Sequence, residues 1–489
     1  MAPGRTLAGS AAKGALFMLI AQAARIVLQL ASVVVLSRLL SPHDYGLIAI
    51  VLVVIGVGEI FRDFGLTSAS VQAPELSRGQ RDNLFWINTG IGVTLGLLAF
   101  ALAWPLQLIS GESELLGILQ VLSSVFLING LTTQYRAQLM RGLRFRAMAI
   151  IDVVSAASAL GIAVILAFAG AGYWALVVQQ LANAAIALIA TVAVGRWLPR
   201  WYSRAYPIGS FVRFGWNLVV ANLLSYGANQ IDTVLVAARF GTAPLGLYNR
   251  AYQLVMTPLG QVRTPLSSVA IPVLSRAQND PVRYESFVVS GQLMLGYTLG
   301  LPLLMVAGLS EPIVQIMLGP QWASAAPILR FFAIAALLTT LPFVGYWVYV
   351  SRGLSRQLMW WTWVSTGIRA VCIVSGSFFG ILGVAAGVAL APAIAWPLSL
   401  WWLSRITTLP VRRLYGGAIR IVCVVATAGL ASWATSQLFI FNSWLAVAMG
   451  AVAGIAAAAL FLSLRIYRVD LALLVRFARL MLKREKELV

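Results

Sequence analysis

Apolar runs long enough to cross a bilayer follow one another along almost the whole chain, separated by short polar or charged segments. A membrane-spanning helix needs roughly 20 apolar residues, and a helix satisfies its own backbone hydrogen bonds in lipid. Only 10% of the residues are charged and 60% are hydrophobic, whereas soluble proteins have about 25% charged residues. We therefore predict an all-α, polytopic membrane protein with about 14 transmembrane helices, at residues 14–36, 46–62, 84–106, 114–135, 147–169, 172–195, 213–237, 245–272, 286–309, 326–350, 357–379, 381–403, 417–438 and 443–464.

The net charge of +20 has a topological explanation and does not indicate nucleic-acid binding. If the N-terminus is cytoplasmic, 27 of the lysines and arginines fall in the predicted cytoplasmic segments. The opposite loops hold two, Arg38 and Arg239. Such an excess on one side follows the positive-inside rule. We therefore expect a multi-pass protein with both termini in the cytoplasm.

A pattern of polar residues in the first predicted helix recurs 200 residues later in the seventh. The spacing i, i+3, i+7 and i+10 places each set on one face of its helix. The turns that follow also match, because Gly46–Leu47 corresponds to Gly246–Leu247 at the same offset. The pattern indicates an internal repeat, and the alternative is a chance recurrence of polar residues. The two sets are Gln22, Arg25, Gln29 and Ser32, and Asn222, Ser225, Asn229 and Asp232.

The repeat divides the predicted helices into two pseudo-symmetric six-helix lobes, residues 1–200 and 201–410. Both copies begin on the cytoplasmic side, so they are parallel repeats like those between the halves of some transporters. Two additional transmembrane helices follow at 411–466, and residues 467–489 form a basic cytoplasmic tail. We expect the tail to lie as a helix on the anionic membrane surface, with a solvated tail as the alternative. Truncation after Arg468 is then expected to leave transport largely intact.

Charged and polar side chains within the spans normally face protein or a water-filled cavity. The two matching polar faces suggest such a cavity between the lobes. Arginines near mid-span are suited to a phosphate-bearing substrate, because the guanidinium fork matches phosphate oxygens. The alternative is an intramembrane ion pair, which for Arg25 would involve Glu59 or Asp232. The candidates for the substrate cavity are Arg25, Arg263, Arg369, Gln22, Gln29, Asn222 and Asn229.

Two acidic residues, Asp232 and Glu59, are the candidates for coupling transport to an ion or proton. Arg62 follows Glu59 at i+3, so a structural ion pair between them is the alternative. The single histidine, His43, cannot form a metal site alone, and we expect neither a metal nor a cofactor. The outward loops are short, and the chain has no phosphate-binding glycine loop followed by Lys-Ser/Thr. The sequence therefore predicts neither an enzyme nor an ATP motor.

Several stretches resemble the polysaccharide flippases of the multidrug/oligosaccharidyl-lipid/polysaccharide exporter superfamily. The similarity runs from the first predicted helix to about residue 410. It implies a two-lobed flippase that moves an undecaprenyl-pyrophosphate-linked oligosaccharide from the cytoplasmic to the periplasmic leaflet by alternating access. The resembling stretches are "SRLLSPHDYGLIAI" (37–50), "FRDFGLTSASVQ" (61–72), "NLFWINTGIG" (83–92), "NQIDTVLVAARFGTAPLGLYNRAYQL" (229–254) and "PVLSR" (272–276).

The resemblance also implies a setting and partners. The location would be the bacterial inner membrane, and the product would supply exopolysaccharide, capsule or O-antigen assembly. The expected partners are the lipid-linked oligosaccharide, membrane lipids, and a polysaccharide polymerase with its export machinery, but no nucleic acid. In the related lipid II flippases, cavity arginines on the first, second and eighth spans are associated with the pyrophosphate headgroup. Arg25, Arg62 and Arg263 lie on those spans here.

Two alternatives to the polysaccharide flippase share its fold. A lipid II flippase would differ mainly in its cargo. A drug or cation antiporter would require an acidic cavity, and the excess of mid-span arginines argues against it.

Overall fold

The computed structural model describes residues 3–63, 70, 76–206 and 209–474. This part of the chain is helical and contains no strand. Eleven stretches within it are long and apolar enough to cross a membrane, and one of them, Ser355–Ile406, contains two helices. The predicted all-helical, polytopic fold is confirmed. The predicted number of 14 is not confirmed, because the two long helices at 209–277 are not among these eleven stretches of the described residues.

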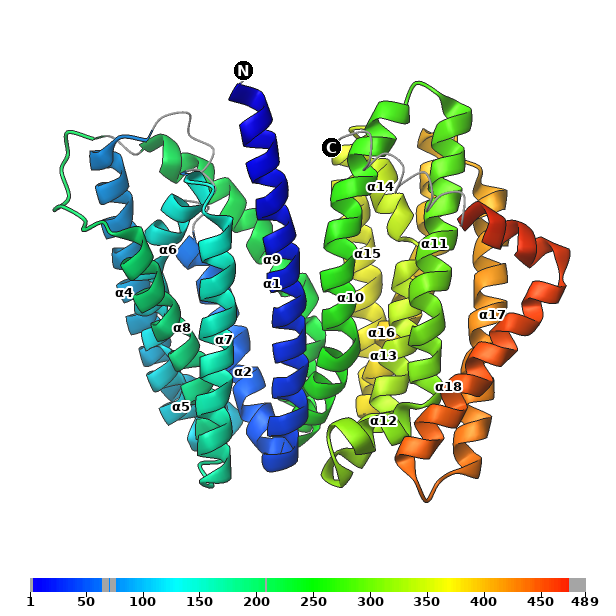
Figure 1. Cartoon of the computed structure of the whole chain (residues 1–489). Coiled ribbons are helices and arrows are strands. Elements are labelled where there is room, and N and C mark those ends of the chain that lie inside the picture. Colours follow the sequence, from blue (N-terminus) through cyan, green and yellow to red (C-terminus); the bar gives the residue numbers. More distant parts are fainter. Residues whose placement is uncertain (1–2, 64–69, 71–75, 207–208, 475–489) are drawn as a thin grey trace. The chain divides into compact units, whose positions relative to one another are not determined.

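Packing divides the chain into two compact units, Met1–Gly246 and Leu247–Val489. In the first unit α4 packs on α6, α7 on α8, α1 on α7, and α2 on α9. The division between lobes predicted at residue 200 follows the repeat and stays a prediction. The helices of the first unit are α1 (Pro3–Leu39), α2 (Pro42–Asp63), α4 (Arg78–Ser110), α5 (Glu114–Leu122), α6 (Ser124–Arg141), α7 (Phe145–Phe168), α8 (Trp174–Gly195) and α9 (Gly209–Phe240) (Figure 1).

The second unit is built around α11, which packs against α13 and α17, while α15 packs on α16 and α18 on α17. Its core contains the fully buried rings of Tyr284 and Tyr349 together with Trp347 and Leu403. The remaining elements are α10 (Thr242–Ala277), α11 (Pro281–Gly308), α12 (Ser310–Met317), η1 (Pro320–Ala325), α13 (Ala326–Thr340), α14 (Phe343–Ser351), α15 (Ser355–Gly376), η2 (Ser377–Phe379), α16 (Gly380–Ile406), α17 (Val411–Leu438), α18 (Ser443–Leu460) and η3 (Phe461–Ser463).

Small residues allow the helix backbones of the first unit to approach closely. Gly92 of α4 and Gly130 of α6 lie against each other, and a methyl group on either would meet a main-chain carbonyl of the other helix. Membrane helices gain little from the hydrophobic effect between them, so close packing of this kind is a main source of their association.

The two glycines that correspond in the repeat lie against each other's helix. Gly46, in the first turns of α2, approaches the carbonyl of Thr242, and Gly246, in the first turns of α10, approaches the carbonyl of Pro42. The starts of α2 and α10 therefore cross in a reciprocal contact inside the first unit. From there α10 continues along the chain into the second unit.

The segment after η3 is anchored to the second unit. Residues 465–474 are helical, and Asp470 is 3% exposed. The guanidinium of Arg420 on α17 donates to both oxygens of Asp470, at 2.8 and 3.0 Å, and the Tyr297 hydroxyl donates to the same carboxylate at 3.1 Å. Leu473 and Leu474 pack against the buried core between α11, α13 and α17. The start of the predicted peripheral tail is thus part of the folded core; residues 475–489 lie outside the described part.

This anchoring changes the expected outcome of truncation. Ending the chain after Arg468 leaves Arg420 without its carboxylate and exposes apolar surface, so we expect a loss of about 2–4 kcal/mol in stability. The thermal midpoint of the detergent-solubilised protein measures it. Truncation after Leu474 is the matched control and should keep nearly the wild-type midpoint. Equal midpoints for the two truncations would contradict a structural role for 470–474.

Candidate functional site

Arg25 on α1 forms an ion pair with Asp152 on α7, with 3.5 Å between Nη1 and Oδ2. The other oxygen of Asp152 binds Arg136 of α6 at 2.9 Å. The Arg25 side chain is 53% exposed and that of Asp152 only 16%. The predicted alternatives, Glu59 or Asp232, are therefore wrong as the partner of Arg25. The carboxylate of Asp152 pairs with two guanidinium groups, so the cluster of Arg25, Arg136 and Asp152 keeps a net positive charge.

Ser32, on the same polar face of α1, also contacts its own unit. Ser32 accepts a hydrogen bond of 3.0 Å from the Gln179 amide on α8. Gln22 and Gln29 are half-buried. The predicted alignment of these residues on one helix face agrees with the continuous helix observed there, whereas their role in substrate binding stays a prediction.

The charge arrangement around Asp152 leads to a testable order of stabilities. Arg25→Gln leaves Asp152 paired with Arg136, so we expect a loss of about 1 kcal/mol or less. Asp152→Asn leaves two guanidinium groups facing each other without a carboxylate, and it should lower the thermal midpoint more. The order should be the reverse if Arg25 were the main stabilising group of the cluster.

Glu59 and Arg62 of α2 form a satisfied network with α6. The Arg62 Nε donates to Glu59 at 2.6 Å, and Arg62 also binds the Thr133 hydroxyl. The second Glu59 oxygen accepts a hydrogen bond of 2.8 Å from the Asn129 amide. The structural ion pair between Glu59 and Arg62 is confirmed. Ion coupling through Glu59 stays a prediction.

The repeated polar face on α9 contains residues of different burial. Asn222 and Asn229 are exposed, and the Asn229 amide donates to the carbonyl of Ser225 at 2.9 Å. Asp232 is 1% exposed and therefore buried in the protein. The coupling role of Asp232 stays a prediction.

Arg263 on α10 has a different environment from the arginines of the first unit. Its Nη2 donates to the hydroxyls of Thr340 at 2.7 Å and Thr339 at 3.0 Å, and to the carbonyl of Ala336 at 3.4 Å. The guanidinium carbon lies 5.0 Å from the centre of the Phe343 ring. Within the described part of the chain, all of these contacts are neutral. Four partners among the described residues position the group, and no carboxylate among those residues pairs with it.

The predicted cavity residues are distributed over both units. Arg25, Gln22, Gln29, Asn222 and Asn229 belong to the first unit. Arg263 and Arg369 belong to the second unit, where Arg369 is half-buried on α15.

Sequence reasoning missed two groups of residues. Thr339, Thr340 and Phe343 position Arg263, but single hydroxyls and a phenyl ring in apolar helices give no distinct signal. The second group lines a basic pocket at one end of the first unit and includes Gln134, Gln138 and Arg141. Their spacing of i, i+4 and i+7 on α6 was a usable signal, because it places all three on one helix face.

Comparison with known proteins gives matches over most of the chain. A family model described as polysaccharide biosynthesis protein matches residues 35–327. The succinoglycan biosynthesis transport protein ExoT of Rhizobium meliloti is 26% identical over 357 residues, which are 72% of each chain. The teichuronic acid biosynthesis protein TuaB of Bacillus subtilis is 25% identical over 439 residues, covering 86% of this chain and 88% of that protein.

Solved structures with a similar fold include a lipid II flippase and a multidrug transporter. The lipid II flippase MurJ in an inward closed conformation gives a TM-score of 0.67 at 14% identity, covering 92% of this chain and 99% of that one. An inward-facing multidrug resistance transporter of the MATE family gives 0.62 at 14% identity, covering 80% and 96%. At this identity the likeness concerns the fold. Together with the family match, these findings confirm the predicted superfamily and the prediction that the chain is not an enzyme.

Proposed function

Because the chain belongs to the polysaccharide biosynthesis protein family, we propose that it is a flippase for a lipid-linked oligosaccharide. The cargo is an oligosaccharide repeat unit on undecaprenyl pyrophosphate, moved from the cytoplasmic to the periplasmic leaflet of the bacterial inner membrane. The names of the relatives, which refer to succinoglycan and teichuronic acid biosynthesis, support a polysaccharide precursor as cargo. The flipped units supply a polymerase and export machinery.

The observation that carries this proposal is the environment of Arg263. A guanidinium held by hydroxyls, a carbonyl and an aromatic ring, with neutral contacts throughout the described part, is prepared to bind an anion. A pyrophosphate headgroup is such an anion. The polar side chains Gln22, Gln29, Asn222 and Asn229 suit the sugar hydroxyls, since amides both donate and accept hydrogen bonds.

The lipid tail of this cargo remains in the bilayer while the polar headgroup crosses. Alternating access then requires that each side of the membrane be closed in turn. Arg25 and Arg263 lie near the middle of their predicted spans, where the headgroup has to cross. Asp232 and Glu59 are the groups proposed to couple the cycle to an ion or proton gradient.

Reconstitution in proteoliposomes tests the proposal. Vesicles contain a fluorescent undecaprenyl-pyrophosphate oligosaccharide in both leaflets, and an impermeant quencher reports the outer pool. We expect the protein to expose about the whole lipid pool to the quencher, while protein-free vesicles expose about half. Movement no faster than in protein-free vesicles would contradict flipping of this cargo.

The second candidate is a lipid II flippase, which is favoured by the fold likeness to MurJ. The same vesicles with lipid II separate the two candidates. We expect faster movement of the polysaccharide precursor than of lipid II, and the opposite preference would favour the second candidate.

A further inference from the structure

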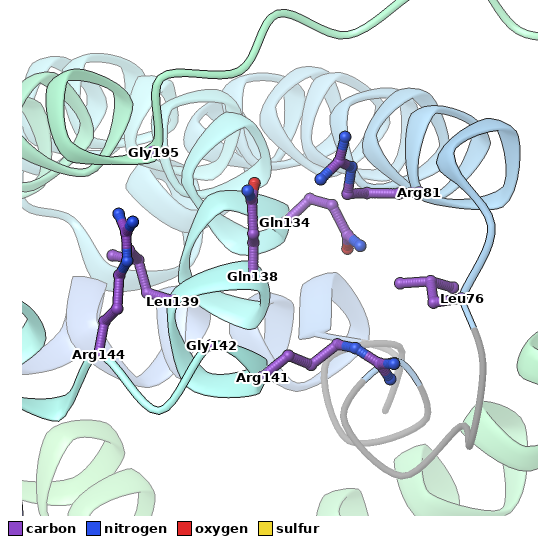
Figure 2. A pocket seen from close by; sticks show the side chains of 9 residues that line it. All are labelled: Leu76, Arg81, Gln134, Gln138, Leu139, Arg141, Gly142, Arg144 and Gly195. Carbon is purple, nitrogen blue, oxygen red and sulfur yellow. The ribbon is translucent and has the colours of Figure 1, made fainter.

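A pocket with a volume of about 370 Å³ lies in the first unit, where α4 begins and α6 ends. Three guanidinium groups line it, those of Arg81, Arg141 and Arg144, together with the amide side chains of Gln134 and Gln138 (Figure 2). No carboxylate is among the described residues of its lining. The charge distribution of the sequence predicts that this end of the unit is cytoplasmic.

Several buried polar atoms at this pocket have no hydrogen-bond partner in the described part of the chain. They are the Oε1 atoms of Gln134 and Gln138 and the Nε of Arg81. Gln134 is only 1% exposed, yet its amide lines the pocket. Buried polar side chains normally have a partner. A polar ligand in this pocket would supply acceptors for the guanidinium groups and donors for the two amide oxygens.

The arginines on the α6 side are positioned by backbone carbonyls. Arg141 donates to the carbonyl of Ser70 at 2.5 Å, and Arg144 donates to the carbonyl of Val194 at 3.3 Å. A guanidinium has five N–H donors, so the one bond that Arg144 makes to the described residues orients the group and leaves donors for a ligand. In Figure 2, Gln134 and Gln138 stand between Arg144 on one side and Arg81 on the other.

The opposite wall is held by aromatic contacts. The guanidinium of Arg81 lies 4.3 Å from the centre of the Trp197 ring, and the Tyr135 hydroxyl donates to the carbonyl of Trp197 at 3.2 Å. Asp82 and Arg78 are the charged neighbours of Arg81. Asp82 compensates part of the charge of Arg81, and the pocket as a whole remains positive because Arg141 and Arg144 add two cations.

We propose that this pocket binds a phosphoryl group attached to a hydroxylated moiety, such as a glycerol phosphate. The arginines bind the phosphoryl oxygens, which match their planar forks, and the glutamine amides bind the hydroxyls. The volume is within the range of small-molecule pockets. Arg263 belongs to the second unit and is not among the residues that line this pocket, and the proposal does not depend on the nature of the transported cargo.

Two sources offer this chemistry, the headgroup of phosphatidylglycerol and a soluble phosphorylated polyol, and two probes distinguish them. Native mass spectrometry of the full-length protein in detergent measures retention of phosphatidylglycerol. Equilibrium dialysis measures binding of glycerol 3-phosphate. If the protein retains phosphatidylglycerol but does not bind glycerol 3-phosphate, the ligand is the lipid headgroup. If it binds glycerol 3-phosphate alone, the ligand is the soluble polyol phosphate. Either result supports the site. Failure of both probes to bind overturns the proposal.

Substitution then locates the binding. The double variant Arg141→Gln/Arg144→Gln should weaken binding of the active probe at least about tenfold, because it removes two charge-assisted contacts. Arg78→Gln is the matched control, since Arg78 is an exposed arginine one turn before Arg81 and does not line the pocket. An equal loss in the control would assign the effect to general surface charge and overturn the site.

Chemical labelling provides a measurement on the wild-type protein, in case the double variant does not fold. The active probe should slow modification of Arg144 by phenylglyoxal at least about threefold and leave the rate at Arg78 unchanged, as followed by peptide mass mapping. An unchanged rate at Arg144 under saturating probe would overturn the proposal.

Discussion

Arg263→Ala is expected to abolish flipping while the protein still accumulates in the membrane. The loss of a charge-assisted contact to the cargo headgroup costs about 2–5 kcal/mol, which corresponds to a roughly 30-fold or larger decrease in transport. Folding should tolerate the change, because the contacts of Arg263 in the described part are neutral and no carboxylate there is left without its partner. The Thr339 and Thr340 hydroxyls keep their own acceptor, the carbonyl of Ala336, at 3.0 and 2.7 Å.

Two further variants separate charge from geometry. Arg263→Lys keeps the charge but loses the planar fork, so we expect partial transport. Thr340→Val keeps the shape of the side chain and removes one positioning hydroxyl, so transport should fall less than in Arg263→Lys. Arg330→Gln is the control, because Arg330 pairs with Glu311 at 3.1 Å. The ligand role of Arg263 is wrong if Arg263→Ala flips at the wild-type rate in vesicles with equal amounts of protein.

The fold was largely predictable because the lipid bilayer restricts the structures that a membrane-spanning segment can form. Apolar runs in lipid form helices, and the predicted ends lie within six residues of the observed ones except at the first helix, which begins at Pro3 and was predicted to begin at residue 14. The end of the eighth span was not predicted correctly. The span was predicted at 245–272 and thus to end at Pro272, whereas α10 runs from Thr242 to Ala277 and contains Pro258, Pro265 and Pro272. Prolines are tolerated in membrane helices because neighbours and local adjustments satisfy the freed backbone groups. Proline therefore did not mark a boundary here.

The partners of charged residues were less predictable than their positions. The pair Glu59–Arg62 was accessible from the sequence, because its members are three residues apart on one helix. Arg25–Asp152 and Arg420–Asp470 join separate helices, and a helix pattern contains no information about which neighbour faces it. For the same reason, Asp470 was assigned to a peripheral tail, although Arg420 and Tyr297 hold it in the core.

The sequence indicated a correspondence between two glycines through the predicted repeat, but it did not predict that they lie in contact. Gly46 and Gly246 were matched by their identical offset, and the structure places each against a main-chain carbonyl at the start of the other's helix. A carbonyl cannot rotate away as a side chain can. The first turns of α2 and α10 must therefore separate if either glycine gains a side chain.

We expect Gly46→Ala and Gly246→Ala each to destabilise the protein by about 1–3 kcal/mol, and valine at either position to do more, since overpacking of a rigid contact is costly. Gly90→Ala and Gly161→Ala are the controls. Both glycines are helical and have no atom within 4 Å of an added methyl group, so alanine should be neutral or stabilising there. Thermal midpoints in detergent measure all four.

The reciprocal geometry predicts more than two separate losses. Once Gly46→Ala has opened the contact, Gly246→Ala has less to displace, so the double variant should lose less stability than the two single variants together. Additive losses would mean that each methyl group is accommodated independently and that the contact is not a single unit. Transport should fall with the same pattern, because Arg263 lies on the helix that begins at this contact.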